Sequence, residues 1–433
     1  MAQNIIINGS NSFDFEIKIP ADKSITHRAI IIASMCEGEI KILNPLLADD
    51  CLSTIEIMRQ LGATISIEND ASLTIKGKNY NNFIEPKKKL YAGNSGTLMR
   101  LISGILSMQN FSSEIFGDDS LMNRPMDRIS RPLEEIGCNL STSGGKPPIK
   151  FYPSNSKKSF KYVNTLASAQ VKSCMIFAAI YLQGESVVKE KFMTRDHTER
   201  LLSYLDYPIK KIGDNIHIKG QGKISAKEIK IPNDVSSAAF FIAAALVKKN
   251  SRLVMKNINF NERRIGIIKI LEKMGAKISI DNERHEANEI IVDITSEYSN
   301  LKPINISGDI ISDLIDELPI LFVVCALCEG VSYIKDIEEL RYKESDRINS
   351  MERGLNKLGI KTESTQSSIK IHGGELLGGI VDSYGDHRVA MAFSVAALVS
   401  KKPITILNTE NVSTSFPNFV DLLIEIGAEV YEL

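Results

Sequence analysis

The sequence lacks an excess of charge of either sign. Its 52 Lys and Arg residues almost balance 53 Asp and Glu residues, so the formal net charge is −1. Without an overall basic field, the chain has no general attraction for nucleic acid or anionic lipid, and any anion site must come from locally clustered cations. We therefore expect no nucleic acid and no membrane among its partners.

Long hydrophobic runs and cysteine pairs are also scarce. The longest apolar stretch, residues 238–247, is far shorter than the roughly 20 residues that cross a bilayer. The first residues, MAQNIIINGS, have no basic start and predict no secretory signal. Six scattered cysteines fit a reducing cytosol better than a disulfide framework. Cys325 and Cys328 form a CxxC inside an apolar run, which favours core residues over metal or redox chemistry. We expect a cytoplasmic protein.

Several cofactor and metal motifs are missing. There is no Walker A loop, and GQGK at 220–223 is too short a match to predict a dinucleotide fold. No HExxH and no clustered Cys and His residues indicate a metal site. We therefore expect no cofactor and no metal, and we assign any phosphate recognition to the substrates rather than to ATP.

What the sequence does contain is a unit repeated six times. A helix that ends in a short aliphatic-glycine turn and leads into an alternating strand recurs along the chain. The turn position falls at Gly62, Gly137, Gly275, Gly359 and Gly427, with Asp206 in a degenerate copy. Glycine suits this position because a helix C-terminus often needs a left-handed residue before the chain turns into a strand.

A second pattern recurs in step with the first. An apolar, Ala-rich helix follows a polar start, at Asp22, Asn94, Ser168, Asp234, Asp316 and Gly385. Ser, Asn and Asp are good helix N-caps, and a helix that is apolar nearly all round is expected to be buried. The second helix of each unit is amphipathic and is expected to lie outside. Each unit thus reads strand, buried helix, strand, outer helix, strand.

These units predict an α/β fold of two similar domains, each with three repeated β-α-β-α-β units. We expect an N-terminal domain of residues 21–232 and a C-terminal domain of residues 1–20 plus 233–433. An α-solenoid scaffold built only for binding is the alternative, but solenoid helix pairs do not need alternating strands such as ATISI and AKISI.

The repeat places six buried-helix N-termini equivalently, and such ends bind anions through free N–H groups and partial positive charge. If the two domains face one another, these ends line a cleft. Polar and charged side chains accompany them: Lys23, Ser24, Arg28, Asn94, Gly96, Arg100, Arg124, Ser168, Gln170 and Arg195 in the first half, and Asp316, Lys343, Glu344, Arg347, Asp386, His387 and Arg388 in the second. Any one such charge alone is usually a surface residue, but the repeated placement argues otherwise. Arg and Lys suit multiply charged anions, and Asp316 and Glu344 suit proton transfer.

At these positions the sequence resembles the 5-enolpyruvylshikimate-3-phosphate synthase family along its whole length. The matching motifs are PADKSITHRA, GNSGTLMR, NRPM, SAQVKS, RDHTE, KESDR and YGDHRVAM. SAQ, RDHTE and GDDS are more similar to the second class of the family than to the first. The resemblance implies the enolpyruvyl transferase architecture, similar to an inside-out α/β barrel, with the active site in the interdomain cleft. It implies transfer of the enolpyruvyl group of phosphoenolpyruvate to the 5-hydroxyl of shikimate 3-phosphate in aromatic amino-acid biosynthesis, with release of phosphate.

The resemblance also implies residue roles. Shikimate 3-phosphate would be held by Lys23, Ser24, Arg28, Ser168, Ala169, Gln170, Arg195, Asp316 and Lys343. Phosphoenolpyruvate would be held by Lys23, Gly96, Arg124, Gln170, Arg347 and Arg388. Asp316 would take the proton of the attacking hydroxyl, Glu344 would handle the proton at the enol methylene, and Lys23 would join them as a catalytic residue. The supporting residues would be Asn94, Arg100, Asp386 and His387.

The sequence departs from the family pattern at a few positions. Ala21 replaces a usual Gly, Ala169 replaces a first-class Ser, and Thr414 lies where first-class members have a substrate-binding Lys. Thr414 therefore receives no role. Gly96 favours sensitivity to the inhibitor glyphosate, whereas the second-class features favour tolerance, so this point stays open.

Other functions fit less well. The sibling transferase that uses UDP-N-acetylglucosamine has a catalytic cysteine in a mobile loop of the second unit, but the comparable stretch 117–128 has none. An RNA-processing enzyme of related repeat fold would need a basic surface and a nucleotide site. A binding scaffold gives no reason for Asp316 and Glu344 among so many cations. We expect a monomer whose two domains close on the substrates.

Overall fold

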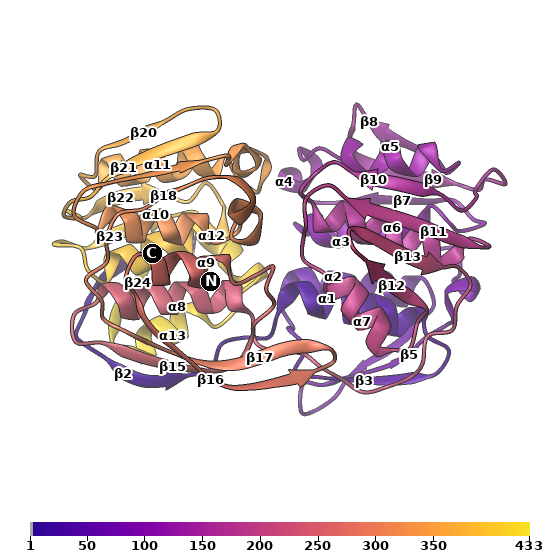
Figure 1. Ribbon diagram of the computed structural model, residues 1–433, viewed down its shortest axis with the longest axis horizontal. Helices are drawn as coiled ribbons and strands as arrows, with labels where there is room; N and C mark the ends of the chain where they lie inside the picture. The colour runs from indigo at the N-terminus through magenta and orange to yellow at the C-terminus, as the bar shows by residue number, and fades with distance from the viewer. Residues whose placement is uncertain (1–2) are drawn as a thin grey trace. The chain divides into compact units, whose positions relative to one another are not determined.

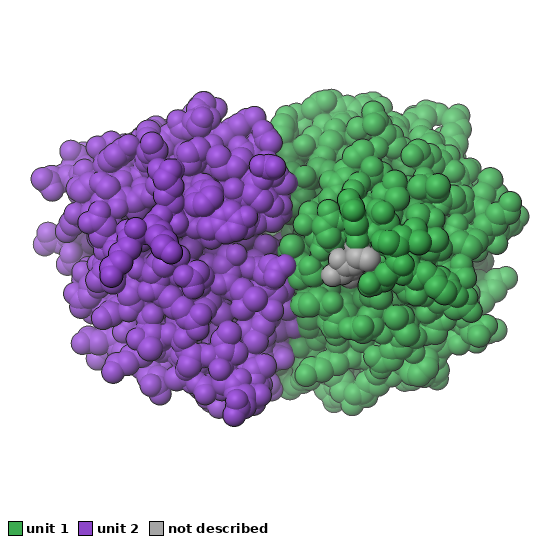
Figure 2. Space-filling model, turned by 180° about the vertical axis from the view of Figure 1, so that it is seen from behind, with its two compact units in different colours: residues 1–20, 233–284, 290–433 green, residues 21–232, 285–289 purple. Residues whose placement is uncertain are grey.

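The computed structural model describes residues 3–433 and divides into two compact units, shown in two colours in Figure 2. Unit 1 contains the chain up to Pro20, residues 233–284 and residues 290–433; unit 2 contains residues 21–232 and 285–289. The expected division placed all of 233–433 in one domain, whereas residues 285–289 group with unit 2. Glu289 belongs to this segment, and its Oε1 lies 2.6 Å from Nδ1 of His197 in unit 2.

Unit 2 contains three successive repeats, each with a buried and an outer helix. The first runs α1 (Lys23–Met35), β3 (Glu39–Leu43), α2 (Asp49–Gln60), β4 (Thr64–Ile67) and β5 (Leu73–Lys76). The second runs β6 (Leu90–Tyr91), α3 (Gly96–Leu106), β7 (Ser113–Phe116), α4 (Asp119–Met122), α5 (Asp127–Glu135), β8 (Asn139–Ser143) and β9 (Lys146–Tyr152). The third runs β10 (Lys161–Asn164), α6 (Ala169–Tyr181), β11 (Glu185–Glu190), α7 (His197–Tyr204), β12 (Ile209–Ile212) and β13 (Asn215–Lys219), followed by β14 (Ile229–Lys230).

Unit 1 contains the other three repeats. The fourth has α8 (Val235–Val247), β15 (Arg252–Asn259), α9 (Gly266–Lys273), β16 (Lys277–Glu286) and β17 (Glu289–Glu297). The fifth has β18 (Asn305–Ile306), α10 (Leu318–Ala326), β19 (Val331–Lys335), α11 (Arg347–Lys357), β20 (Thr362–Ser364) and β21 (Ser368–His372). The sixth has β22 (Gly379–Asp382), α12 (His387–Ala397), β23 (Ile404–Leu407), α13 (Phe419–Glu425) and β24 (Ala428–Glu432), and the unit also includes β1 (Asn4–Ser10) and β2 (Asp14–Ile17).

Each repeat builds a four-stranded sheet of the same order, and most of these strands are labelled in Figure 1. Two short strands lie in the sheet of a distant repeat. Strand β14 directly precedes α8 but pairs in parallel with β3, whereas β2 directly precedes α1 but pairs in parallel with β15. At the end of the chain, β24 pairs antiparallel with β1. Each unit is therefore completed by strands that are distant in sequence from the repeats they join.

The predicted helix-ending turns are confirmed in all six repeats. Gly62, Gly137, Gly275, Gly359 and Gly427 have φ between 87° and 104°, and Asp206 has φ 58°. This left-handed region is open to glycine and is adopted by few other residues, among which Asp is enriched.

The buried helices begin mostly at the predicted polar residues. Side chains that accept a first-turn N–H belong to Asp22, Ser95, Ser168, Asp234 and Asp386. The predicted starts at Asn94, Asp316 and Gly385 were each wrong by one residue. The fifth helix, α10, begins after Glu317, which makes no side-chain cap, and its first turn contains Pro319. Proline tolerates this place because the first N–H groups of a helix have no partner within the helix.

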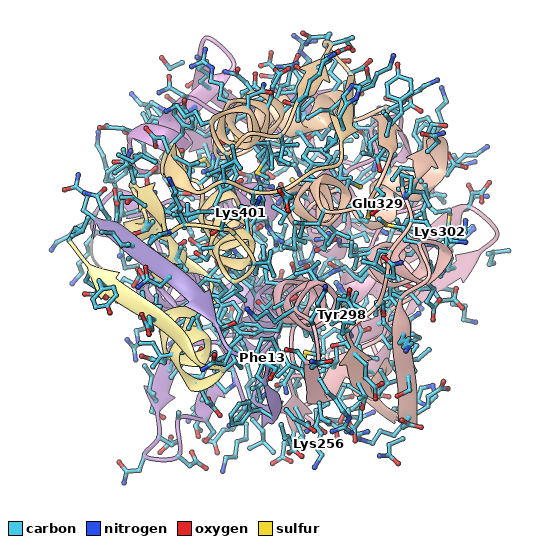
Figure 3. The ribbon with its side chains drawn as sticks, turned by 90° about the vertical axis from the view of Figure 1, so that its left-hand side faces the viewer. Phe13, Lys256, Tyr298, Lys302, Glu329 and Lys401 are labelled. Atoms are coloured by element: carbon cyan, nitrogen blue, oxygen red, sulfur yellow. The ribbon has the colours of Figure 1, made fainter. Side chains whose placement is uncertain are left out.

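In unit 1 the buried helices α8, α10 and α12 contact one another. Figure 3 views this unit nearly along their axes, from the side that carries Glu329 and Lys401. These two residues follow the C-terminal ends of α10 and α12 in sequence. The N-terminal ends of α10 and α12 therefore lie on the opposite side of unit 1. Among residues 3–433 no helix is long and apolar enough to span a membrane.

Candidate active site

The first cationic side chain of unit 2 lies at the start of α1. Lys23 Nζ is 2.9 Å from Asp50 Oδ2, and the two side chains are 16% and 9% exposed. Asp50 stands in the first turn of α2, where a carboxylate also favours the positive end of the helix. The ammonium group is thus held near the helix start yet stays in partial contact with solvent. Ser24 follows it, and its carbonyl accepts from Arg28.

Arg28 lies deeper in unit 2 and is only 3% exposed. Its Nε donates to Thr198 Oγ1 at 2.8 Å, and a terminal nitrogen donates to Ser173 Oγ at 3.2 Å. The Ser173 and Thr198 hydroxyls lie 2.7 Å apart. Arg28 therefore links α1 to α6 and α7, and its substrate role stays a prediction.

Two guanidinium groups flank the start of α3. A Cβ placed on Gly96 would lie 3.1 Å from Arg124 Nη1 and 3.3 Å from Arg100 Nη1. Arg124 also donates to Asn94 Oδ1 at 2.6 Å, and the Asn94 amide donates to Asp118 Oδ2 at 2.7 Å. The absence of a side chain at Gly96 lets both guanidinium groups lie close to the helix N-terminus. Such a place suits an anion.

The start of α6 joins the same cluster. Ser168 caps the helix, and Ala169 is its first residue. Gln170 Oε1 accepts from Arg100 Nη1 at 2.6 Å, and Gln170 Nε2 donates to Thr97 Oγ1 at 3.0 Å. These bonds connect the first turns of α3 and α6.

Arg195 lies in the loop between β11 and α7. The preceding residue, Thr194, presents its carbonyl to Lys172 Nζ at 3.3 Å, so this loop is fastened to α6. Lys172 lies on α6, three residues after Ala169 at the start of that helix.

Carboxylates dominate the corresponding cluster of unit 1. Arg347, the first residue of α11, is 1% exposed. Its Nε donates to Asp386 Oδ2 at 2.8 Å and its Nη2 donates to Glu344 Oε2 at 2.5 Å. Its Nη1 lies 3.6 Å from Asp316 Oδ1. One guanidinium thus gathers the predicted proton-transfer residues Asp316 and Glu344.

The starts of α10 and α12 meet around the same residues. Arg388 Nη1 donates to the Asp316 carbonyl at 2.9 Å and lies 3.7 Å from Glu317 Oε1. Lys343 Nζ lies 3.5 Å from Asp316 Oδ1. Asp386 Oδ1 accepts from the Arg388 amide at 2.9 Å, which caps α12. His387, the first residue of that helix, is buried.

Two buried side chains of the candidate site, Arg347 and His27, have shifted pKa values. Burial opposes the charge of Arg347, but Asp386, Glu344 and Asp316 raise its pKa above the ordinary value, so the guanidinium stays charged. In unit 2, burial and the charges of Lys23 and Arg28 lower the pKa of His27 well below 6.5.

In its neutral form, His27 links α1 to α2 and to the N-cap of α3. Its Nδ1 lies 2.6 Å from Thr54 Oγ1 of α2, and its Nε2 lies 3.4 Å from Ser95 Oγ, which caps α3.

Every predicted site residue is thus placed in one of two sets, one in each unit. Sequence reasoning missed Asp50, Asp118, Ser173 and Thr198, which pair with the predicted residues. The acidic pair at 49–50, directly at a helix start, was the one visible signal for Asp50. Within residues 3–433, no group of three or more His, Cys, Asp and Glu side chains is arranged to hold a metal ion.

Comparison with known proteins decides the family. The model of the EPSP synthase (3-phosphoshikimate 1-carboxyvinyltransferase) family matches residues 7–423. The chain belongs to the EPSP synthase family. The 3-phosphoshikimate 1-carboxyvinyltransferase of Coxiella burnetii (strain CbuK_Q154) is 42% identical over 97% of this chain and 96% of the relative. That of Petrotoga mobilis is 43% identical over 98% of this chain and 99% of the relative.

Solved structures agree with this family. The EPSP synthase of Acinetobacter baumannii has a TM-score of 0.87 and 39% identity, covering 99% of this chain and 100% of that one. The enolpyruvyl transferase NikO from Streptomyces tendae has a TM-score of 0.80 at 16% identity, covering 100% of this chain and 99% of that one, and this likeness shows the fold alone. The α/β fold of repeated units is therefore the fold of EPSP synthases and of an enolpyruvyl transferase. The expected fold class is confirmed.

Proposed function

We propose that this family member transfers the enolpyruvyl group of phosphoenolpyruvate to the 5-hydroxyl of shikimate 3-phosphate and releases inorganic phosphate. The observation that carries the assignment of roles is the surroundings of Gly96, where the guanidinium groups of Arg100 and Arg124 lie next to the N-terminus of α3. A compact, multiply charged anion such as phosphoenolpyruvate suits that place, because Arg offers forked hydrogen bonds to carboxylate and phosphate.

The cations of unit 2 would bind the two anionic substrates. Lys23 and Arg124 would contact phosphoenolpyruvate, together with Gly96 and Gln170. Lys23, Ser24, Arg28, Ser168, Ala169, Gln170 and Arg195 would hold shikimate 3-phosphate. Within this set, Asn94 would orient Arg124 and Arg100 would orient Gln170, as their hydrogen bonds of 2.6 Å suggest.

The carboxylates of unit 1 would move protons. Asp316 would accept the proton of the 5-hydroxyl as its oxygen bonds to the central carbon of phosphoenolpyruvate, while Glu344 would deliver a proton to the methylene carbon. The product of this addition is a tetrahedral ketal phosphate. Return of a proton from the new methyl group to Glu344, with loss of phosphate, would regenerate the double bond.

The remaining residues of unit 1 would bind and orient. Arg347 and Arg388 would add positive charge for phosphoenolpyruvate, and Lys343 would contact the hydroxyls of shikimate 3-phosphate. Asp386 and His387 would support the two arginines. The shared contacts of Arg347 with Asp316 and Glu344 are consistent with two acids acting on the same reacting centre.

Both sets of residues would have to act on one pair of substrates. We therefore propose that the active site is formed by both domains, 21–232 and 1–20 plus 233–433, and that they close when the anions screen the repulsion between cations. Small-angle scattering should show a smaller radius of gyration with shikimate 3-phosphate than without it. An unchanged radius would count against closure.

The reaction is tested directly by phosphate release. Purified protein should release phosphate from phosphoenolpyruvate when shikimate 3-phosphate is present and not when UDP-N-acetylglucosamine replaces it. Release only with the amino sugar would overturn the proposal in favour of the sibling transferase.

We also propose that the enzyme is a cytosolic monomer. All six cysteines are buried thiols outside disulfides, which supports a reducing compartment. Sedimentation should give the mass of one 48.0 kDa chain, and a larger species would contradict the monomer.

A further inference from the structure

A buried cluster of charges lies in unit 2 beside the residues assigned to substrate. Lys172 on α6 is fully buried, and its Nζ lies 3.1 Å from Glu190 Oε1 and 2.8 Å from Glu199 Oε1. The two carboxylate side chains are 0% and 9% exposed. Glu190 ends β11 and Glu199 lies in the first turn of α7, so the cluster joins three elements.

The cluster also fastens the loop between β11 and α7. Glu190 Oε1 accepts from the Thr194 amide at 3.0 Å and from Thr194 Oγ1 at 2.6 Å. The Thr194 carbonyl accepts from Lys172 Nζ at 3.3 Å. Three polar groups of one residue are thus committed to the cluster. That residue directly precedes Arg195, so the cluster restrains the backbone from which Arg195 extends.

The other end of the loop is fastened by hydroxyl groups. Thr198 Oγ1 lies 2.7 Å from Ser173 Oγ, which follows Lys172 on α6. Thr198 therefore ties the start of α7 to the same turn of α6 that carries Lys172. Residues 195–197 lie between these two attachments, and Arg195 is the cation among them assigned to shikimate 3-phosphate.

Stability alone does not account for this cluster. Burying an ammonium group with two carboxylates carries a large desolvation cost, and apolar residues of similar volume often replace buried ion pairs without loss of stability. Lys211 Nζ, 3.6 Å from Glu190 Oε2, adds a second positive charge at the edge of the cluster. The charged contacts restrain the loop in a fixed direction, and apolar packing would not do so.

We propose that Lys172, Glu190 and Thr194 form a positioning cluster that holds Arg195 at a set distance from the N-terminus of α6, so that both contact the phosphate of shikimate 3-phosphate. This inference rests on the proposed function. The cluster makes no contact with substrate in this scheme and acts through Arg195.

The test uses Thr194, because Lys172→Met would leave two carboxylates buried without their cation. Thr194→Val keeps the shape of the side chain and removes the hydroxyl, whereas Thr194→Ser keeps the hydroxyl. We expect Thr194→Val to raise KM for shikimate 3-phosphate about ten-fold, the effect of one hydrogen bond to a charged group. KM for phosphoenolpyruvate should stay within about two-fold. Thr194→Ser should return KM for shikimate 3-phosphate to that of the unaltered enzyme.

A matched control separates positioning from stability. Val188 lies on β11, two residues before Glu190, and is fully buried. Val188→Ala should lower the melting temperature and leave both KM values unchanged. The inference is overturned if Thr194→Val alters neither KM, alters both equally, or is not rescued by Thr194→Ser. Phosphate release by the unaltered enzyme is measured first, so failure of the proposed function would appear before any variant is compared.

Discussion

The two units place different partners around the arginines at their helix starts. In unit 2, Arg124 donates to Asn94 Oδ1 and Arg100 donates to Gln170 Oε1, so neutral amides orient both guanidinium groups. In unit 1, Arg347 contacts three carboxylates, those of Asp316, Glu344 and Asp386. Equivalent repeats thus place amides beside two arginines of unit 2 and carboxylates beside one arginine of unit 1.

This difference separates two tasks. Cations that donate to amides keep their attraction for anionic substrates, because an amide orients them without neutralising them. Carboxylates held by a buried guanidinium are fixed in position and are available to exchange protons. The account therefore assigns substrate binding chiefly to unit 2 and proton transfer to unit 1.

The largest effect is expected at the acids of unit 1. Asp316→Asn and Glu344→Gln should each lower kcat about 10³-fold, the contribution typical of a general acid or base. Both changes keep the size of the side chain, so substrate affinity measured by calorimetry should change little. A variant with near-normal turnover would remove that residue from the proton-transfer scheme.

A smaller effect is expected at the cations of unit 2. Arg124→Lys should raise KM for phosphoenolpyruvate about ten- to hundred-fold, because Lys cannot reproduce the forked hydrogen bonds of the guanidinium. Arg131→Lys is the matched control. The Arg131 side chain is 73% exposed, and its Nη2 lies 3.1 Å from Asp127 Oδ2. An equal response of the two variants would contradict the binding role of Arg124.

The close approach of two guanidinium groups to Gly96 offers a narrower test. In Gly96→Ala the new methyl group would lie 3.1 Å from Arg124 Nη1, so the guanidinium must shift by a few tenths of an ångström. We expect KM for phosphoenolpyruvate to rise about ten-fold, in line with modest overpacking. Gly374→Ala is the control, because its methyl group would meet only Ile360 Cδ1 at 3.5 Å. Unchanged kinetics in Gly96→Ala would place the anion elsewhere.

The smallest effect concerns pH and the neutral His27 of unit 2. Its folded-state pKa is lowered by burial and by Lys23 and Arg28, so the unfolded chain binds a proton that the folded chain excludes. The free energy of unfolding should therefore fall as pH drops below about 6.5, by at most about 1.4 kcal/mol per pH unit. Denaturation between pH 7 and pH 5 measures this slope.

One variant isolates the contribution of this ring. His27→Gln should lower the slope of the unfolding free energy against pH by up to the slope of one bound proton, about 1.4 kcal/mol per pH unit. Identical slopes in the unaltered protein and in His27→Gln would show that His27 does not exclude the proton.

The repeat could be predicted from the sequence because it depends on local chemistry. Gly62 and its counterparts mark helix ends that need positive φ, and even Asp206 adopts that conformation. Buried helices follow from apolar faces and polar starts. The sequence already assigned residues 1–20, and with them β2, to the C-terminal domain. The particular pairing of β14 with β3 and of β2 with β15 could not be predicted, because it joins segments far apart in sequence and leaves no local pattern.

The site was predictable only in part for the same reason. Lys23, Arg347 and Asp386 are visible in motifs, but the pairing of Lys23 with Asp50 and of Arg347 with Asp386 is fixed by packing between helices. The Arg28 contacts with Ser173 and Thr198 likewise depend on three elements meeting. A motif indicates which residues carry chemistry, whereas the fold decides what each of them contacts.

The division of tasks is tested most directly by the rate of a single turnover at saturating phosphoenolpyruvate and shikimate 3-phosphate. Arg124→Lys should recover to within about ten-fold of the unaltered enzyme at saturation, whereas Glu344→Gln should stay about 10³-fold slower at every concentration. The account is contradicted if higher substrate concentration rescues Glu344→Gln and fails to rescue Arg124→Lys.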